Sequence, residues 1–209
     1  MEVLRRLARR QGMHAYVLPG PEPGASIGVF RPFPTRPDGL PPLVLLGPDR
    51  NLASFTARLD SQRAGTVESR SLSITDKTVQ RATAQVRDLE LLGAAAAAGT
   101  TQPTTRLTPP GRDGAVDAAQ AATAALERQS YAFEASGSLL GDCYGAVLAP
   151  YRVLSVRGVN GRQSGDYVIK SVTHRLTRSA YEQSFSLLRN ARSEGSDADA
   201  LGALAAGIF

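Results

Sequence analysis

The 209-residue sequence contains one cysteine, two histidines and no tryptophan. A single cysteine excludes an internal disulfide framework and a cysteine-based zinc site, and we expect Cys143 to be a small buried apolar residue. His14 and His174 belong to no His-x-x-x-His or Glu-x-x-His grouping of the kind that holds a metal. The sequence also has no glycine-rich phosphate loop. We therefore predict neither a metal nor a cofactor.

Long hydrophobic runs are missing as well. The longest apolar run, Ala94 to Ala98, is too short to cross a bilayer. The N-terminus alternates arginine with leucine, and the apolar core of a secretory signal does not follow it. We expect a soluble protein that is synthesised in the cytoplasm and has no membrane anchor.

Lysine is scarce. Of the 24 basic residues 22 are arginine, and these are spread over the chain. The net charge of +5 and the pI near 9.8 would suit a nucleic-acid partner. The one cluster, Arg5, Arg6, Arg9 and Arg10, has no interleaved aromatic residues on which bases could stack. The pattern argues against nucleic acid as a partner, and a basic module that binds polysaccharide or nucleic acid is kept as an alternative.

Catalytic motifs are equally lacking. The serines form no G-x-S-x-G nucleophile elbow. A glycosidase needs two carboxylates about 5 to 9 Å apart, and the spacing of Glu127, Glu134 and Asp142 does not exclude such a pair. Nothing distinguishes these three from ordinary surface acids. We predict that the chain is not an enzyme, with a small cell-wall hydrolase as the alternative.

Glycine and proline are abundant, at 20 and 13 residues, which favours short strands over a helical bundle. Eight prolines in residues 19–42 predict a loop with one short strand at Ile27 to Phe30. Leu43 to Leu46 has the composition of another short strand. Asn51 to Leu59 fits a helix or a strand, and the alternating segment Val67 to Ile74 after it favours a pair of strands that ends in a turn.

Two segments have helical periodicity. The first, at about 2–11, places Val3, Leu4, Leu7 and Ala8 on one face opposite the four arginines, and Gly12 stands where a C-terminal cap belongs. The second, at about 114–129, can be capped by Asp113 and has a face of small residues. Extended segments follow both helices, at 14–18 and 131–135. The fold class that we predict is mainly β (α+β) with two short helices.

Residues 147–191 predict a β-meander of three strands. The first ends at Arg157, and the others run from Tyr167 to Leu176 and from Tyr181 to Arg189. In the third strand, apolar residues alternate with serines, so one face is buried and the other is exposed to water. In the second strand Val168, Val172 and Leu176 fall on one face with Lys170 and His174. The turns contain residues suited to chain reversal: Gly158, Gly161, Ser164 and Gly165.

The order of residues in this meander resembles the phage late control D family. That family supplies the tail-hub proteins of contractile phage tails and of phage-derived extracellular injection systems, and the hub half of type VI spike proteins is related to it. The helix-to-strand junction LRRLARRQGMHAYV is similar to the same family. The matching residues of the meander are Val147, Leu148, Pro150, Val153, Val156, Gly158, Ser164, Gly165, Tyr167, Val168, Val172, His174, Tyr181, Phe185, Leu187, Arg189 and Asn190.

The resemblance implies tail-tube-like β-barrel elements and no catalytic chemistry. It further implies a homotrimer that connects the tail tube protein to the spike protein, adapts sixfold to threefold symmetry and becomes part of a phage tail or injection particle. Family members carry another domain before the first helix, so we expect a short variant, a misassigned start or a second polypeptide that supplies it. The structural or interface candidates are Tyr167, Val168, Ile169, Val172, His174, Tyr181, Phe185, Leu187, Arg189 and Asn190.

The expected domain organisation follows composition along the chain. Residues 1–92 would form a second hub domain with its Pro-rich loop at 19–42, and 93–112 a flexible Ala/Thr/Pro linker. Residues 113–191 would complete a tube-like barrel, and 192–209 would be a tail that is frayed rather than docked on a neighbour. For His174, a core-edge imidazole bonded to a backbone carbonyl is favoured over a polar contact at a subunit interface.

Overall fold

The computed structural model describes residues 2–72, 76–99, 105–108 and 115–193. It divides into two compact units, each built from segments that alternate along the chain. Unit 1 comprises Met1–Phe33, Gln62–Leu89 and Gly99–Ser130, and unit 2 comprises Pro34–Ser61, Glu90–Ala98 and Tyr131–Phe209. The predicted mainly β class with two α-helices is confirmed. The sequence suggested consecutive domains, whereas long-range strand pairing interleaves the segments.

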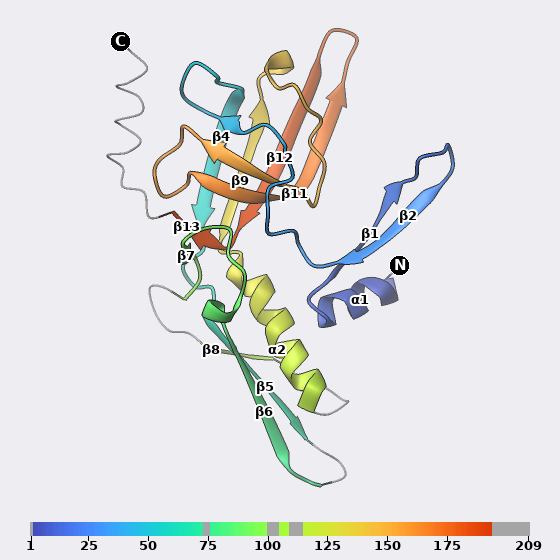
Figure 1. Ribbon diagram of the computed structural model, residues 1–209, viewed down its shortest axis with the longest axis vertical. Coiled ribbons are helices and arrows are strands. Elements are labelled where there is room, and N and C mark those ends of the chain that lie inside the picture. The colour runs from blue at the N-terminus through green and yellow to red at the C-terminus, as the bar shows by residue number, and fades with distance from the viewer. Residues whose placement is uncertain (1, 73–75, 100–104, 109–114, 194–209) are drawn as a thin grey trace. The chain divides into compact units, whose positions relative to one another are not determined.

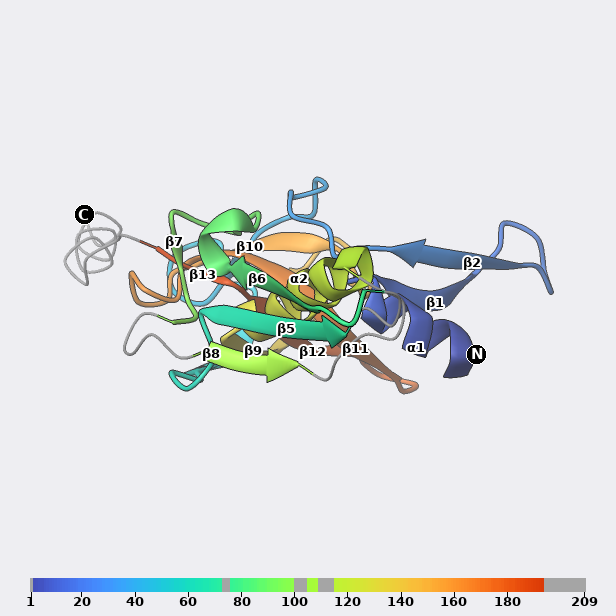
Figure 2. The same ribbon diagram turned by 90° about the horizontal axis from the view of Figure 1, so that it is seen from below.

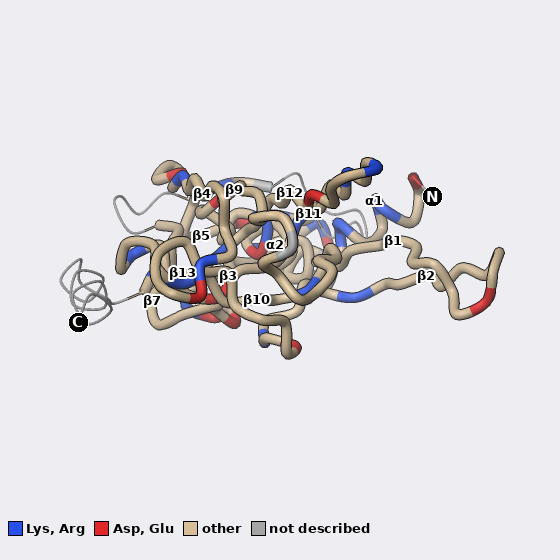
Figure 3. The backbone as a smooth tube through the Cα atoms, turned by 90° about the horizontal axis from the view of Figure 1, so that it is seen from above, with Lys and Arg blue, Asp and Glu red and all other residues tan. Residues whose placement is uncertain are grey.

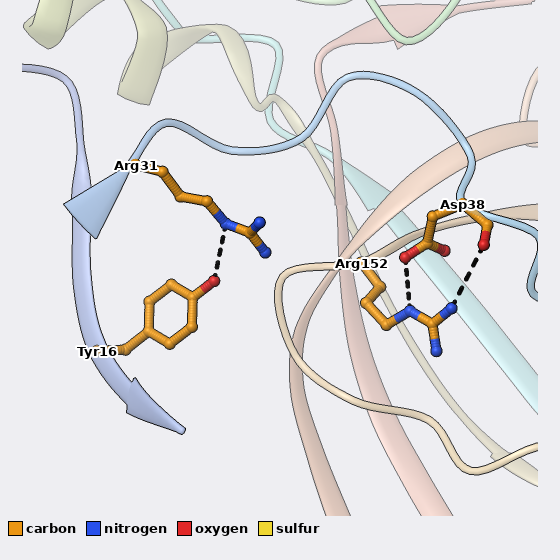
Figure 4. Close-up of polar contacts among 4 residues, drawn as sticks. All are labelled: Tyr16, Arg31, Asp38 and Arg152. Carbon is orange, nitrogen blue, oxygen red and sulfur yellow. Dashed lines mark hydrogen bonds and ion pairs between the residues drawn. The ribbon is translucent and has the colours of Figure 1, made fainter. Parts of the chain in front are cut away.

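Unit 1 begins with helix α1 (Glu2–Arg10) and a hairpin of β1 (His14–Pro19) and β2 (Ser26–Arg31). The predicted helix and the predicted strand at 27–30 are confirmed. Gly12, at φ 71°, lets Met13 N–H donate to the Ala8 carbonyl at 2.8 Å and end the helix. Arg31 Nε donates to the Tyr16 hydroxyl at 3.0 Å across the hairpin (Figure 4).

The apolar face predicted for the first helix is only partly buried. Ala8 is buried, but Leu4 and Leu7 are half exposed and Val3 is 68% exposed. A nine-residue helix offers only two or three turns for contact, and the elements that α1 contacts within unit 1, β1 and α2, cover the side that carries Ala8.

Unit 1 also contains a three-stranded sheet with a helix packed on it (Figure 2). Strand β5 (Thr66–Leu72) pairs with β6 (Val79–Gln85) antiparallel and with β8 (Thr105–Thr108) in parallel, and a short 3₁₀ turn, η1 (Val86–Asp88), follows β6. Helix α2 (Ala115–Ser130) packs against β5 and β6 through small side chains that permit close approach. The helix predicted at 114–129 is confirmed, and its predicted cap Asp113 lies outside the described residues. The buried residues of α2 include Ala118, Ala122, Ala124, Ala125 and Leu126.

Unit 2 is built on a curled six-stranded sheet (Figure 1). The predicted meander is confirmed as β10 (Val153–Arg157), β11 (Gly165–Leu176) and β12 (Tyr181–Arg189), with β9 (Phe133–Leu139) paired to β12. The edges are β3 (Leu43–Val44), parallel to β10, and β4 (Leu52–Leu59), antiparallel to β9. The short 3₁₀ turn η2 (Gly141–Cys143) follows β9. Cys143, expected to be buried, is exposed at the end of this turn.

Two expectations about the middle of the chain need correction. The strand pair predicted for 51–59 and 67–74 does not form: β4 pairs with β9, and β5 pairs with β6 and β8. Phe55 of β4 pairs with Gly137 of β9, whose missing side chain leaves room for the Phe185 ring and the Ser54 carbonyl. Within 93–112, β7 (Ala95–Ala96) pairs with β13 (Ala191–Arg192), and β8 covers four residues. The linker residues 100–104 and 109–112 lie outside the described part of the chain.

The faces of β11 also differ from the prediction. A β-bulge between Ile169 and Ser171 shifts the register, so Ile169 pairs with Leu187 and Val172 with Phe185. One extra residue reverses the alternation of side chains beyond it. The residues predicted to share a face therefore divide. Val168 and Lys170 share a face with Leu188 and Glu134, whereas Val172, His174 and Leu176 share the opposite face with Phe185.

Candidate functional site

Most of the interface candidates form the framework of unit 2. Val172 and Tyr181 are half-buried, and His174 is exposed. These three are the accessible members of the set, and their role at an interface stays a prediction. The other seven are buried: Tyr167, Val168, Ile169, Phe185, Leu187, Arg189 and Asn190.

Arg189 is the largest fully buried side chain of the described residues, with 1% of its surface exposed. Its guanidinium donates to the Ser164 carbonyl at 2.9 Å and to Ser193 Oγ at 2.8 Å. It also lies 5.3 Å from the ring centroid of Tyr167, a cation–π contact. Burial raises the pKa of Tyr167, and the Arg189 charge opposes that shift. Arg189 thus ties the end of β12 to the turn that precedes β11.

The turn before β11 leaves room for this guanidinium at Gly165. Gly158 and Gly165 have φ of 68° and 134°, conformations that favour glycine. A Cβ at Gly165 would collide with the guanidinium of Arg189. Ser164 Oγ donates to the Asn160 carbonyl at 3.1 Å, and Gly161 is buried. The predicted turn therefore also forms one wall of the Arg189 site.

Two buried amide side chains hold loops against the meander. Asn190 accepts from Leu92 N–H and donates to the Glu90 carbonyl, both at 2.9 Å, which keeps residues 90–97 beside β13. Gln183 accepts from Leu148 N–H at 2.8 Å and donates to the Ala146 carbonyl at 3.1 Å. Sequence reasoning missed Gln183, although its position two residues before Phe185 placed it on the buried face of the strand.

The Pro-rich loop of unit 2 is fastened in the same way. Arg152 forms an ion pair with Asp38 at 2.6 Å (Figure 4). The Tyr144 hydroxyl donates to the Pro41 carbonyl at 2.8 Å, and burial, aided by Asp38 and opposed by Arg152, raises the pKa of Tyr144 to about 12. Asn51 donates to the Pro42 carbonyl and accepts from Val44 N–H. The loop between Pro34 and Pro42 is therefore anchored to the sheet.

The outer face of the sheet displays hydroxyl groups in two rows that cross four strands. Six of the eight residues are exposed and two are half-buried. Ser54 and Ser138 are joined by an Oγ to Oγ hydrogen bond of 3.0 Å. Lys170 and Glu134, 2.6 Å apart, lie beside the rows, and so does the pair of Arg175 and Glu182. The first row is Ser54, Ser138, Ser184 and Thr173, and the second is Thr56, Ser136, Ser186 and Ser171.

The tip of the β11–β12 hairpin carries a pair of rings, the exposed His174 and the half-buried Tyr181. His174 Nδ1 lies 2.7 Å from the Tyr181 hydroxyl, and the rings stack with centroids 5.9 Å apart. The sequence suggested a backbone carbonyl as the partner of the His174 ring, whereas the partner in the structure is the Tyr181 hydroxyl. Leu176 beside them is 76% exposed. A cavity of about 700 Å³ lined by Tyr181, Glu182 and serines opens next to the tip, and Glu182 is the one carboxylic acid among its lining residues.

Two of the three acids considered for glycoside hydrolysis lie beside basic residues. Glu134 of unit 2 pairs with Lys170. Burial raises the pKa of Glu127 in unit 1, with Arg128 opposing the shift. The side chain of Asp142 lies outside the description. Among the described residues, no three or more His, Cys, Asp or Glu side chains gather as metal ligands would, and no helix has both the length and the hydropathy to span a bilayer.

His14 in unit 1 gives the protein a pH-dependent stability. Its ring stacks on Phe33 with centroids 3.6 Å apart, and burial, followed by the charge of Arg128, lowers its pKa from 6.5 to about 4. Between these values the unfolded chain binds a proton that the folded chain does not. This contribution to stability is therefore complete above pH 6.5 and is lost as the pH falls toward 4.

We expect the free energy of unfolding to fall by roughly 1 kcal/mol between about pH 7.5 and about pH 5, a value reduced for solvent screening of a partly exposed ring. Urea denaturation at both pH values measures this difference. His14→Phe keeps the stacking and removes the titration, so its difference should be smaller. An equal pH dependence in both proteins would contradict the assignment.

The comparisons with known proteins rest on structure. No protein-family model and no curated protein matches the sequence. The crystal structure of the 43 kDa tail protein of prophage MuSo2 from Shewanella oneidensis is similar with a TM-score of 0.60 and 16% identity, over 90% of this chain and 53% of that chain. The tail protein from Neisseria meningitidis MC58 is similar with a TM-score of 0.56 and 13% identity, over 95% and 56%.

The chain has the fold of these two tail proteins. It spans about half the length of these two tail proteins. The expectation of tail-type β elements is met at the level of the fold. Membership of the late control D family stays a prediction.

Proposed function

We propose that the chain is a structural component of the baseplate hub of a contractile phage tail or injection particle. It joins the tail tube protein to the spike protein as a homotrimer and adapts sixfold to threefold symmetry. The observation that supports the proposal is the fold that the chain shares with tail proteins, in which the curled sheet of unit 2 leaves strand edges open.

Two edges of this sheet can accept a neighbour. β4 is the last strand at one side. At the other side β10 pairs with only the first part of β11, so from Ser171 to Leu176 the described residues provide β12 alone as a partner. Open strand edges pair readily with another chain. Copies of this chain and of the tube protein could therefore continue the sheet around a ring.

The surface chemistry of unit 2 also supports a mechanical role. The outer hydroxyl rows offer hydrogen bonds, and the charges beside them are of both signs. Neutral hydroxyl groups need an adjacent base to act as nucleophiles. The hydrogen bond of Ser54 is to another serine, and the carboxylate of Glu134 is engaged by Lys170. We infer that the sheet serves contact and support and turns over no substrate.

Native mass spectrometry of the full chain, alone and with its tube and spike proteins, tests the proposal. We expect a trimer, with Leu176→Asp raising its dissociation constant about tenfold or more because it places a charge at the open end of β11. Val147→Asp is the matched control, since Val147 is also exposed in unit 2, at 62%, but lies outside the strands.

Three results would contradict the hub assignment. One is a chain that stays monomeric in the presence of both partners, and another is an equal effect of the two substitutions. The third is release of peptidoglycan fragments that depends on Glu134, measured with Glu134→Gln.

A further inference from the structure

Unit 1 contains a cavity lined by arginines. It has a volume of about 290 Å³ and lies where the end of α1, strand β8 and helix α2 come together. Four of the eight lining residues are arginine, and none of the eight is acidic or aromatic. The lining residues are Arg9, Arg10, Arg106, Leu107, Ala121, Ala125, Arg128 and Gln129.

The guanidinium of Arg128, an exposed residue, is fixed beside the other arginines by a hydrogen bond. Arg128 Nη1 donates to the main-chain carbonyl of Arg9, which fixes the side chain against the end of α1. Burial lowers the pKa of Arg128, and the charges of Arg9 and Arg106 lower it further, while Glu127 beside it acts in the opposite direction. An anion placed among the three guanidinium groups would therefore relieve repulsion between them.

The charge of the chain is concentrated in the same unit. Unit 1 contains 13 Lys or Arg residues against 8 Asp or Glu residues, whereas unit 2 contains 11 of each. The entire net charge of +5 thus belongs to unit 1. Figure 3 marks the basic positions of α1 in blue. A field of one sign around a concave site attracts and orients ligands of the opposite sign.

We propose that this cavity, the arginine cavity, receives aspartate or glutamate side chains of a protein partner. Guanidinium groups bind carboxylates through paired hydrogen bonds. The remaining wall, with Leu107, Ala121 and Ala125, fits the apolar part of an inserted side chain, and Leu107 is 61% exposed. A single-stranded nucleic acid would need aromatic platforms for its bases, which this lining does not contain. The proposal is independent of the hub assignment, because it requires only the isolated chain.

The test uses the full chain and a fluorescent hexaglutamate peptide, with binding measured by anisotropy at low salt. We expect Arg9→Gln combined with Arg106→Gln to raise the dissociation constant about tenfold or more. Arg81→Gln combined with Arg87→Gln is the matched control, because both of these residues are exposed on other parts of unit 1 and the net charge changes equally. Amide chemical shifts of Leu107 and Ala125 should move when the peptide binds.

Two results would overturn the proposal. Equal loss of affinity in both double variants would mean that the peptide responds to diffuse charge and not to the cavity. Tighter binding of a hexathymidylate than of hexaglutamate, lost in the Arg9/Arg106 variant alone, would assign the cavity to nucleic acid. Circular dichroism of both variants, which keep Arg128 and its bond to α1, checks that the fold is retained.

Discussion

Replacing Arg189 by methionine is expected to lower the free energy of unfolding by about 2–4 kcal/mol. Methionine keeps much of the length of the side chain but donates no hydrogen bond, so the carbonyl of Ser164 and the hydroxyl of Ser193 lose the guanidinium. The contact with the Tyr167 ring is also lost. Urea denaturation of the full chain measures the change.

The control for this variant is Arg178→Met. Arg178 lies in the exposed turn between β11 and β12, so its replacement should change stability by less than about 0.5 kcal/mol. Arg189→Lys should fall between the wild type and the methionine variant, because a single ammonium cannot replace the planar fork. A methionine variant as stable as the wild type would show that Arg189 does not hold the turn.

Gly137→Ala is expected to destabilise unit 2 by about 3 kcal/mol. Gly137 lies between Phe55 of β4 and Phe185 of β12 in the register of the sheet. A Cβ at this position would collide with the Ser54 carbonyl and would lie 2.8 Å from the Phe185 ring. Because the Ser54 carbonyl is part of the backbone, the clash with it is relieved only if β4 moves away from β9.

The matched substitution is Gly145→Ala. Gly145 is exposed, and a Cβ there would have no heavy atom within 4 Å, so stability should stay within about 0.5 kcal/mol of the wild type. Hydrogen exchange adds a second readout, since Gly137→Ala should expose the amides of β4 more than those of β10. Equal unfolding midpoints for the two alanine variants would refute this account of the glycine.

Local sequence patterns predicted much of the secondary structure. The helices and the three meander strands follow from periodicity, as with Phe185 and Leu187 between serines, because the side chains alternate wherever the ladder is regular. Gly12 marks the end of α1 for the same local reason. These features depend on residues that are close in sequence.

Features that depend on distant partners were not predictable. The bulge after Ile169 is defined by the pairing of β11 with β12, and it reverses the face of every residue beyond it. The partner of β4 lies in β9, far along the chain, so proximity in sequence suggested the wrong pair. β6 and β8 were not predicted, because residues such as Gln80 and Arg81 give no clear alternation.

The candidate site also combines features that the sequence indicated with features that depend on distant partners. Arg189 and Asn190 were selected through the family resemblance, but the resemblance did not reveal that both are buried and bind loop carbonyls. The hydroxyl rows exist only once four strands are in register. The arginine cavity likewise combines residues of α1, β8 and α2, whose separation along the chain hides the cluster.

The positions of β3 and β4 bear on how the polypeptide folds as it is synthesised. These two strands are neighbours in the sequence, at Leu43–Val44 and Leu52–Leu59, but they form opposite borders of the six-stranded sheet. Every strand between them begins at Phe133 or later. The nascent segment that contains β3 and β4 must therefore wait for the second half of translation before it acquires its native neighbours. Such non-local closure is slow and leaves apolar strands open to chaperones in the meantime.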